Sequence, residues 1–569
     1  MIDVDIASFT YPGQFKAALK DIRFRITPGE CVLIAGPTGC GKSTLLKCLN
    51  GIIPHASEGT LAGTVHMNGS DTQTVPLARM AGMVGMVQQN PDDQIFSLVV
   101  EDEVGFGPEN LCLPVAEIDR RIDTALSQVG MQPYRKHRVD ALSGGQRQRI
   151  VIASILAMQP AVLLLDEPAS QLDPKGAREI LSVMARLSAE SKRAMVLVEH
   201  RIHEVAHLAN RFIIMDQGRI VLDADRQTVF QKHIDLFHHL GLRLPETVEL
   251  FHRLDLDDQP LTTDDALTAL RKNLKRKDEP RHAAPGRAAP DMKTGDRPPA
   301  ITIDDLWFAY EGQNWTLKGV SLGISQGEIV ALLGNNGSGK STLLLQMCGI
   351  LKPARGEVSI FGGCITHKKP ESLVGDVAVV FQDPGLMLCC DTVEKETAFG
   401  PGNLNVAPAE IDKRVRETLT VMTLSDMAAK APQSLSGGQR LRAAVASVLS
   451  MQPRIVLLDE PTSGQDRRNI KGFMEHLKTL SGEGITSVFI THDMETALEF
   501  AHRIIILDHG TILADGKPAT IFADGDTIAQ TSLKPPQTMA LCAGLGLSPS
   551  FCVAELADRI RRGDGPWLM

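Results

Sequence analysis

The chain opens with alternating polar and apolar residues, a pattern typical of short strands. Over residues 2–30 the alternation is interrupted by turn residues at Pro12-Gly13 and Pro28-Gly29, which predicts antiparallel strands joined by tight turns. The apolar runs 32–35 and 161–165 then predict buried strands. A helical spacing of apolar residues precedes the second run. The pattern therefore predicts an α/β fold.

Two short motifs follow one another at a fixed separation and occur twice. LSGGQ at 142–146 precedes LLDEP at 164–168, and the pair returns at 435–439 and 457–461. Ser143 and Asp166 are 23 positions apart, as are Ser436 and Asp459. A chain of 569 residues is too long for a single core, so the repeat predicts two halves of ordinary domain size.

Each half also carries a phosphate loop between an apolar strand and a predicted helix. Both loops match G-x-x-x-x-G-K-[ST], in which glycine amides surround a phosphate, the lysine reaches the β- and γ-phosphates, and the hydroxyl reaches Mg²⁺. The occurrence of two matches, each followed by the same two motifs, predicts nucleotide binding. The candidate residues are Gly36, Pro37, Thr38, Gly39, Cys40, Gly41, Lys42, Ser43, Thr44, Gly334, Asn335, Asn336, Gly337, Ser338, Gly339, Lys340, Ser341 and Thr342.

The LSGGQ motif leads into a helical pattern, so its backbone amides lie at the positive end of a helix dipole, where an anion can bind. Its candidate residues are Ser143, Gly144, Gly145, Gln146, Ser436, Gly437, Gly438 and Gln439. The acidic pair of LLDEP follows a buried strand. We expect Asp166 and Asp459 to hold Mg²⁺, together with Ser43 and Ser341, and Glu167 and Glu460 to orient or deprotonate a water molecule.

Two further polar residues recur in register. Gln89 and Gln382 each follow a strand and precede a turn, where a neutral amide can join the Mg²⁺ shell when the site closes. Without the repeat, each would be interpreted as an ordinary turn residue. His200 and His492 follow a third apolar strand, at the edge where open α/β sheets bind ligands. Their recurrence favours contact with a γ-phosphate and a water molecule over a purely structural role.

An aromatic residue follows the first strand of each half. Tyr11 and Tyr310 are candidates for stacking on an adenine ring. The alternative is an aromatic residue at a strand end that only packs, and position alone does not separate the two interpretations.

Composition limits the classes of function. The formal net charge is −9 with acids and bases well mixed, so we expect no nucleic acid partner. The ten cysteines show no repeated metal-type spacing and are interpreted as reduced thiols, the adjacent pair Cys389-Cys390 included. The acidic, turn-rich residues 1–13 predict no secretory segment, and the longest apolar stretch, 150–165, is interrupted by Gln159-Pro160 and predicts no membrane span.

The regions outside the repeated motifs predict appendages and a linker. The expected domains are 1–235 and 301–530, with a helical appendage at 236–276, a linker at 277–300 and a C-terminal appendage at 531–569. We expect Asp264 or Asp265 to cap a helix in the first appendage. The linker is rich in proline, alanine and charge, and it is long enough for the two domains to turn face to face.

The order of these motifs, present twice, resembles the nucleotide-binding domains of ATP-binding cassette (ABC) proteins. The resemblance implies an α/β fold of two tandem P-loop domains, each with a RecA-like core, an antiparallel β subdomain and a helical signature subdomain. It implies an ATPase with ATP and Mg²⁺ as its cofactors. It also implies head-to-tail pairing of the domains, so that each phosphate loop faces the LSGGQ segment of the other half.

Within that family, PDDQIF at 91–96 and FGPENL at 106–111 resemble the ATPases of energy-coupling factor importers. This resemblance implies transport of a vitamin, a vitamin precursor or a metal ion. It implies two kinds of membrane partner, a transmembrane coupling protein and a substrate-binding membrane protein, and a peripheral location on the cytoplasmic face of the membrane. In the second half, GLM at 385–387 and FGPGNL at 399–404 depart from the pattern, so the halves are expected to meet different surfaces.

Two alternatives remain open at this point. A soluble tandem cassette ATPase acting on ribosomes would also have two such halves, but the joint here is short and proline-rich rather than a long charged helical arm. A fused ATPase of a sugar-type importer is the other alternative. One half of such proteins typically has a degraded catalytic site, whereas both halves here keep the acidic pair and the histidine.

Overall fold

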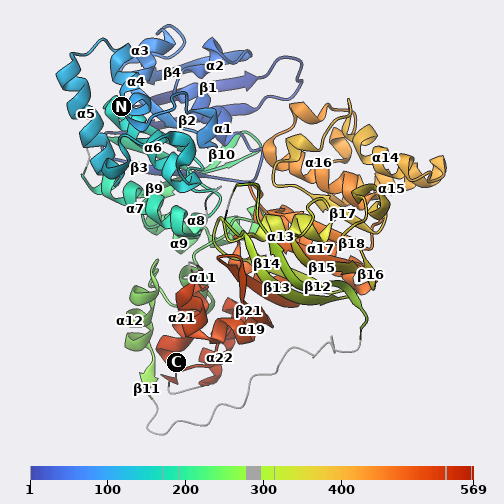
Figure 1. The fold of residues 1–569 in the computed structure, drawn as a ribbon. Helices are drawn as coiled ribbons and strands as arrows, with labels where there is room; N and C mark the ends of the chain where they lie inside the picture. The colour runs from blue at the N-terminus through green and yellow to red at the C-terminus, as the bar shows by residue number, and fades with distance from the viewer. Residues whose placement is uncertain are drawn as a thin grey trace. The chain divides into compact units, whose positions relative to one another are not determined.

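A computed structural model of the chain describes residues 2–170, 172, 174–190, 193–276, 297–312, 314–531, 533, 535–564 and 567–568. The chain divides into two compact units, Met1–Ala266 and Leu267–Met569. Each contains a four-stranded sheet, a six-stranded sheet and a set of helices in the same order along the chain (Figure 1).

The first unit contains an antiparallel sheet and a mostly parallel sheet. The antiparallel sheet has the order β2-β1-β4-β5, with β1 Ile2–Thr10, β2 Leu19–Ile26, β4 Thr60–Met67 and β5 Ser70–Asp71. The mostly parallel sheet has the order β10-β9-β3-β8-β7-β6, with β3 Cys31–Ala35, β6 Val84–Val87, β7 Val162–Asp166, β8 Ala194–Val198, β9 Arg211–Asp216 and β10 Arg219–Asp225. Only β10 runs antiparallel in this second sheet.

The first unit has two apolar cores, one on each face of the mostly parallel sheet. Side chains alternate along a strand, so Val32 and Ile34 of β3 join the core shared with the antiparallel sheet, while Leu33 and Ala35 join the core beneath the helices. A strand buried on both faces consists of apolar residues throughout. Its ends are the places where polar residues reach solvent, and the candidate site lies there.

Most helices of the first unit pack on the face of the parallel sheet that lies away from the antiparallel sheet. The helix after the phosphate loop is α1, Lys42–Leu49. The helices α4 Val100–Asn110, α5 Val115–Gln128 and α6 Gly144–Ala157 pack against one another as a helical subdomain (Figure 1). The remaining longer helices are α7 Pro174–Glu190, α9 Arg226–Lys232, α10 Ile234–Leu240 and α11 Glu246–Arg253.

The second unit repeats this plan. Its antiparallel sheet is β13-β12-β15-β16, with β12 Pro299–Phe308, β13 Leu317–Ser325, β15 Arg355–Ile360 and β16 Gly363–Cys364. Its other sheet is β17-β18-β19-β14-β20-β21, with β14 Ile329–Leu333, β17 Val377–Val380, β18 Ile455–Asp459, β19 Thr486–Ile490, β20 Arg503–Asp508 and β21 Thr511–Gly516. The main helices are α13 Lys340–Met347, α14 Val393–Asn403, α15 Pro408–Val421, α16 Gly437–Leu449, α17 Arg467–Gly482, α18 Met494–Phe500 and α19 Pro518–Ala523.

The boundary between the units falls inside α12, Thr263–Asn273. Arg271 donates a hydrogen bond to the carbonyl of Gly544 (2.9 Å) in α21, Gln537–Leu545. After α12, β11 Lys275–Arg276 pairs antiparallel with β22 Trp567–Leu568. The end of the predicted first appendage thus belongs to the same unit as the C-terminal one, which also contains α22, Val553–Arg562.

Two details of the first appendage and linker differ from, or lie outside, the sequence-based expectation. The prediction that Asp264 or Asp265 caps α12 is wrong, because the amide of Asp265 donates to the hydroxyl of Thr262 (3.2 Å). That hydroxyl precedes the helix, where a side-chain oxygen can accept from a first-turn amide. Residues 277–296 of the predicted linker lie outside the described residues.

Candidate active site

In the first unit, the phosphate loop joins β3 to α1. Its lysine, Lys42, is buried and donates from Nζ to the carbonyls of Gly36 (2.8 Å) and Pro37 (3.0 Å). The lysine therefore curves over its own loop, so its ammonium group lies at the turn that the motif predicts for phosphate. Lys340 does the same in the second unit, donating to Gly334 (2.9 Å) and Asn335 (2.8 Å).

The first residue of each loop must be glycine, because the backbone of the neighbouring strand lies very close to it. Gly36 has φ 158°, and a Cβ there would lie 2.2 Å from the carbonyl oxygen of Met215 at the end of β9. In the second unit a Cβ at Gly334 would lie 2.1 Å from the carbonyl of Leu507 in β20. The loop thus folds tightly onto the neighbouring strand, and only glycine fits there.

Asp166, the last residue of β7, faces the start of α1. Its carboxyl group hydrogen-bonds to the hydroxyl of Ser43. Burial, followed by the negative charge of Glu167, raises the pKa of Asp166 to about 6, and the Ser43 hydrogen bond and Lys42 oppose that rise. Asp459 and Ser341 form the matching pair, and burial likewise raises the pKa of Asp459. A carboxylate and a hydroxyl are hard oxygen donors, so these residues fit Mg²⁺.

Glu167 has a backbone conformation that is rare for a non-glycine residue. Its φ is 47° and that of Glu460 is 52°. Such conformations are costly, and they cluster at active sites. The turn they make directs the glutamate side chain away from the path of the strand, toward the histidine that follows the next strand.

The glutamate, histidine and glutamine of the first unit meet at one point. His200 Nε2 lies 2.9 Å from Glu167 Oε1, and Gln89 Nε2 donates to Glu167 Oε2 (3.3 Å). Burial disfavours the charged carboxylate, but His200, Lys42 and Arg201 hold the pKa of Glu167 below its ordinary value. In the second unit His492 Nε2 lies 2.9 Å from Glu460 Oε1. A charged carboxylate beside an imidazole is suited to orienting a water molecule.

The LSGGQ segments begin α6 and α16 with identical caps. The Ser143 hydroxyl accepts from the amide of Gln146 (3.3 Å), and the Gln146 side chain accepts from the amide of Ser143 (2.9 Å). Ser436 and Gln439 form the same pair. The serine and glutamine thus cap each helix, a role that the S-x-x-Q spacing indicates. The amides of the two intervening glycines take no part in these capping bonds.

The two tyrosines contact their own phosphate loops. The Tyr11 hydroxyl lies 3.1 Å from Thr44 Oγ1, and that of Tyr310 lies 3.2 Å from Thr342 Oγ1. Each ring also packs edge-on against a phenylalanine two positions earlier. The tyrosines therefore combine packing with a place beside the loop, and the bond to the threonine was not foreseen from the sequence.

Sequence reasoning also missed a buried glutamate in each helical subdomain. Glu103 Oε2 accepts the amides of Phe96 (2.9 Å) and Ser97 (2.8 Å), which fixes the loop that leads from Gln89 to α4. Glu396 does the same in the second unit. The available signal was their equal spacing, since each lies 14 positions after its glutamine.

The family of the chain follows from comparison with known proteins. The family model described as ABC transporter matches residues 19–170 and 317–463. The chain belongs to the ABC transporter family. This result confirms the fold class and the sequence-based resemblance, and it makes the chain an ATPase that couples ATP hydrolysis to transport, with ATP and Mg²⁺ as cofactors.

Relatives match this ABC ATPase over nearly its whole length. A Methanosarcina mazei protein, provisionally named ABC transporter ATP-binding protein, is 45% identical over 98% of this chain and 96% of its own. A Bacillus subtilis protein, provisionally named HMP/thiamine import ATP-binding protein YkoD, is 33% identical over 93% and 94%. The solved structure of cbiO1 from Clostridium perfringens, described as part of the ABC transporter complex cbiONQ, is 32% identical, with a TM-score of 0.38, over 42% of this chain and 97% of that chain.

Among the described residues of the ABC ATPase, no helix has the length and apolar character needed to span a bilayer. Proteins with the ATP-binding role in a transporter act with membrane subunits, and this chain is therefore one component of a larger assembly.

Proposed function

We propose that the chain is the energy-coupling ATPase of an importer for a vitamin, a vitamin precursor or a metal ion. The observation that carries the proposal is the relation, over nearly full length, to a protein named for HMP/thiamine import. The PDDQIF and FGPENL motifs of the first unit support the energy-coupling type, and the structure gives these motifs a physical role in building one surface.

That surface consists of large apolar side chains around α4 of the first unit. Phe96 is 76% exposed and stacks on Phe106, with ring centroids 5.9 Å apart. Gln94 folds the loop beneath them, because its side chain accepts from the amide of Gln88 (2.6 Å) and donates to the carbonyl of Met86 (2.9 Å). Leu98, Leu111 and Val115 are further exposed apolar residues, one before α4 and two after it. We name the stacked pair Phe96 and Phe106 the α4 patch.

The α4 patch is proposed to dock a cytoplasmic segment of the transmembrane coupling protein. Exposed clusters of large apolar residues mark contact sites between proteins. The loop below the patch begins at Gln89, whose side chain contacts Glu167. A change at the nucleotide can therefore reach the patch through a single loop. The substrate-binding membrane protein would complete the complex and select the transported molecule, and the chain would lie peripherally on the cytoplasmic face.

Each unit is proposed to hydrolyse ATP by positioning and charge neutralisation. Lys42 and Lys340 would bind the β- and γ-phosphates, while Glu167 and Glu460 polarise the attacking water, with the adjacent histidines stabilising the charge. Mg²⁺ would be held by the aspartate and serine of each unit, with Gln89 or Gln382, and would neutralise charge on the phosphates. Tyr11 and Tyr310 would contact the adenine ring.

We propose that the two units pair head to tail around two ATP molecules. The support is the signature helix, whose first-turn glycine amides lie at the positive end of the helix dipole, where an anion can bind. The first site would combine Lys42, Glu167 and His200 with Ser436, Gly437 and Gly438. The second would combine Lys340, Glu460 and His492 with Ser143, Gly144 and Gly145. Closure on ATP and opening after product release would then move the membrane subunits.

The test is co-purification from detergent-solubilised membranes after expression with the neighbouring genes. We expect small hydrophobic membrane proteins to co-elute with the wild type and to change its ATPase rate. The double variant Phe96→Ser/Phe106→Ser should lose them while still hydrolysing ATP alone. Phe15→Ser is the matched control, because Phe15 is fully exposed between β1 and β2 and lies outside the α4 patch.

Two results would contradict the proposal. If the chain remains free of membrane proteins and sediments with ribosomes, the ribosome-acting alternative replaces it. If the membrane proteins that co-elute transport a sugar, the chain is the ATPase of a sugar-type importer.

A further inference from the structure

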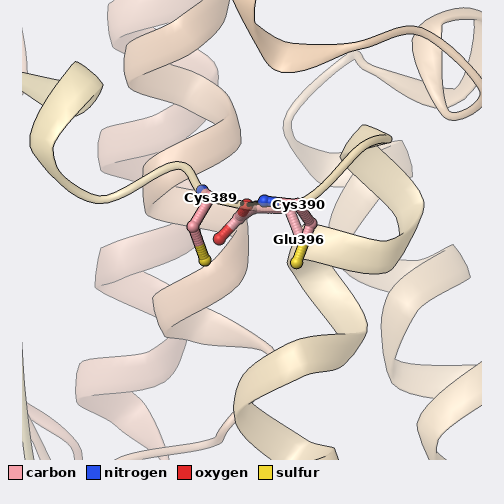
Figure 2. Close-up of side chains that lie close together, drawn as sticks. All are labelled: Cys389, Cys390 and Glu396. Carbon is pink, nitrogen blue, oxygen red and sulfur yellow. Dashed lines mark hydrogen bonds between the residues drawn. The ribbon is translucent and has the colours of Figure 1, made fainter.

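The second unit carries an adjacent pair of thiols at a position where the first unit has none. Cys389 and Cys390 lie just before α14, in the loop that leads from Gln382, and occupy the places of Phe96 and Ser97. Figure 2 shows both sulfur atoms beside the carboxylate of Glu396, which projects from α14 toward the loop. The sulfur atoms and a carboxylate oxygen lie within 4.8 Å of one another.

The backbone of this loop is fixed without help from the thiols. Glu396 Oε2 accepts the amides of Cys389 (2.8 Å) and Cys390 (2.7 Å). The first unit makes the same two bonds to Glu103 with a phenylalanine and a serine in the loop. The thiol groups are therefore an addition to a loop that folds in either form, and the Cys390 side chain also hydrogen-bonds to Glu396 and to Cys389.

We propose that Cys389, Cys390 and Glu396 bind a thiophilic divalent cation of the Zn²⁺ type. Two sulfurs and one carboxylate oxygen suit Zn²⁺, which accepts both ligand types, better than Mg²⁺ or Ca²⁺, which prefer oxygen alone. Glu396 is buried and held by two amides, so one ligand is preorganised. Cys389 is exposed and Cys390 is half-buried, which leaves an entry path from solvent.

Three protein ligands leave one position of a tetrahedral ion for water or for a group from a partner. Zn²⁺ binds cysteine as thiolate, so binding at this pair releases protons. The proposal concerns binding alone and does not rest on the transport function. Its position matches that of Phe96 in the α4 patch, so the two units offer chemically different surfaces.

The test uses the full-length chain, reduced with a phosphine, in a Zn²⁺ titration against a chromophoric chelator. The wild type should bind one more Zn²⁺ than the variant Cys389→Phe/Cys390→Ser, which copies the residues of the first unit. The control variant Cys112→Ser/Cys364→Ser/Cys552→Ser removes three other exposed thiols and should keep that ion. Because the first variant lacks two of the three ligands, its loss of affinity should exceed the roughly 10- to 100-fold cost of changing a residue outside the ligand shell.

A second measurement does not depend on any variant. Co²⁺ added in place of Zn²⁺ should give the near-ultraviolet charge-transfer absorption of cobalt bound to thiolates, with about one Co²⁺ per chain. Equal Zn²⁺ stoichiometry in the wild type and Cys389→Phe/Cys390→Ser would overturn the proposal. The absence of the thiolate band from the wild type loaded with Co²⁺ would overturn it as well.

Discussion

Glu199 provides a quantitative test of the electrostatics around the active site. It precedes His200, its side chain is 2% exposed, and it accepts a hydrogen bond from the amide of Ala169 (3.4 Å). Burial, followed by the charges of Glu167 and Glu204, raises the pKa of Glu199 from its ordinary value of 4.5 to about 8, against the opposing effect of Arg201. At neutral pH the carboxyl group is therefore protonated. The second unit has Thr491, also neutral, at this position.

The perturbation is Glu199→Gln, which keeps the acceptor oxygen and the shape but cannot ionise. Between pH 4.5 and 8 the unfolded chain has lost this proton and the folded chain has kept it, so the stability of the wild type falls as pH rises. Each tenfold change in an ionisation constant corresponds to about 1.4 kcal/mol, so the penalty reaches about 2 kcal/mol at pH 6 and about 5 kcal/mol above pH 8. The variant carries no such penalty.

The assay is urea unfolding of the full-length protein at pH 6 and pH 9. Unfolding of the first unit is monitored by hydrogen exchange of peptides from β7 and β8. The three tryptophans all lie in the second half of the sequence, so their fluorescence does not report on the first unit. The stability gained by Glu199→Gln over the wild type should grow by about 3 kcal/mol between the two pH values. ATP hydrolysis at pH 7 should be unchanged.

The control is Glu58→Gln, which alters an exposed carboxylate of the same unit and should give the same stability difference at both pH values. If Glu199→Gln gains no more stability at pH 9 than at pH 6, Glu199 is ionised throughout this range. The account of a neutral group beside His200 would then be wrong.

Three further substitutions test the phosphate loops, and Gly69→Ala, outside the loops, is a control. Lys42→Ala should weaken ATP binding to the first unit about 10- to 100-fold, because a hydrogen bond to a charged group contributes about 1.5–3 kcal/mol, and Lys340→Ala should do so in the second. Calorimetric titration of each variant checks this, and unchanged binding by both would exclude the lysines as phosphate ligands. Gly36→Ala should abolish binding to the first unit, because its Cβ would lie 2.2 Å from Met215 O. The control is Gly69→Ala, because Gly69 has a positive φ but nothing within 4 Å of an added Cβ. This variant should lose about 1–2 kcal/mol of stability and keep its ATP affinity. Equal ATP affinity in the two glycine variants would refute the steric argument.

The α/β fold could be predicted because its signals are local. A strand buried on both faces, such as β3, is apolar throughout, and the residues that follow strands are the ones that reach the sheet edge. Each sequence motif also occurs in both halves, and this recurrence separates a functional motif from a chance match. Glu167 and His200 lie 33 positions apart in sequence and 2.9 Å apart in space, and both follow parallel strands that are neighbours in the sheet.

The interactions that escaped prediction depend on partners that no local pattern indicates. Glu103 lies in an acidic run that looks like a solvated helix start, yet its carboxylate is buried against two loop amides. Thr262 replaced the expected aspartates as the cap of α12, because several candidate caps were adjacent and only geometry separates them. The bond of Arg271 to Gly544 spans 273 positions, a separation beyond the range of any sequence pattern.

The central claim is that both units hydrolyse ATP through the glutamate that follows the buried strand. The most direct measurement is ATPase activity and ATP stoichiometry of Glu167→Gln, Glu460→Gln and the double variant. Loss of a catalytic base costs about 10²- to 10⁴-fold in rate. We predict that the double variant binds two ATP molecules and loses hydrolysis by that factor. A double variant that hydrolyses ATP at the wild-type rate would contradict the account.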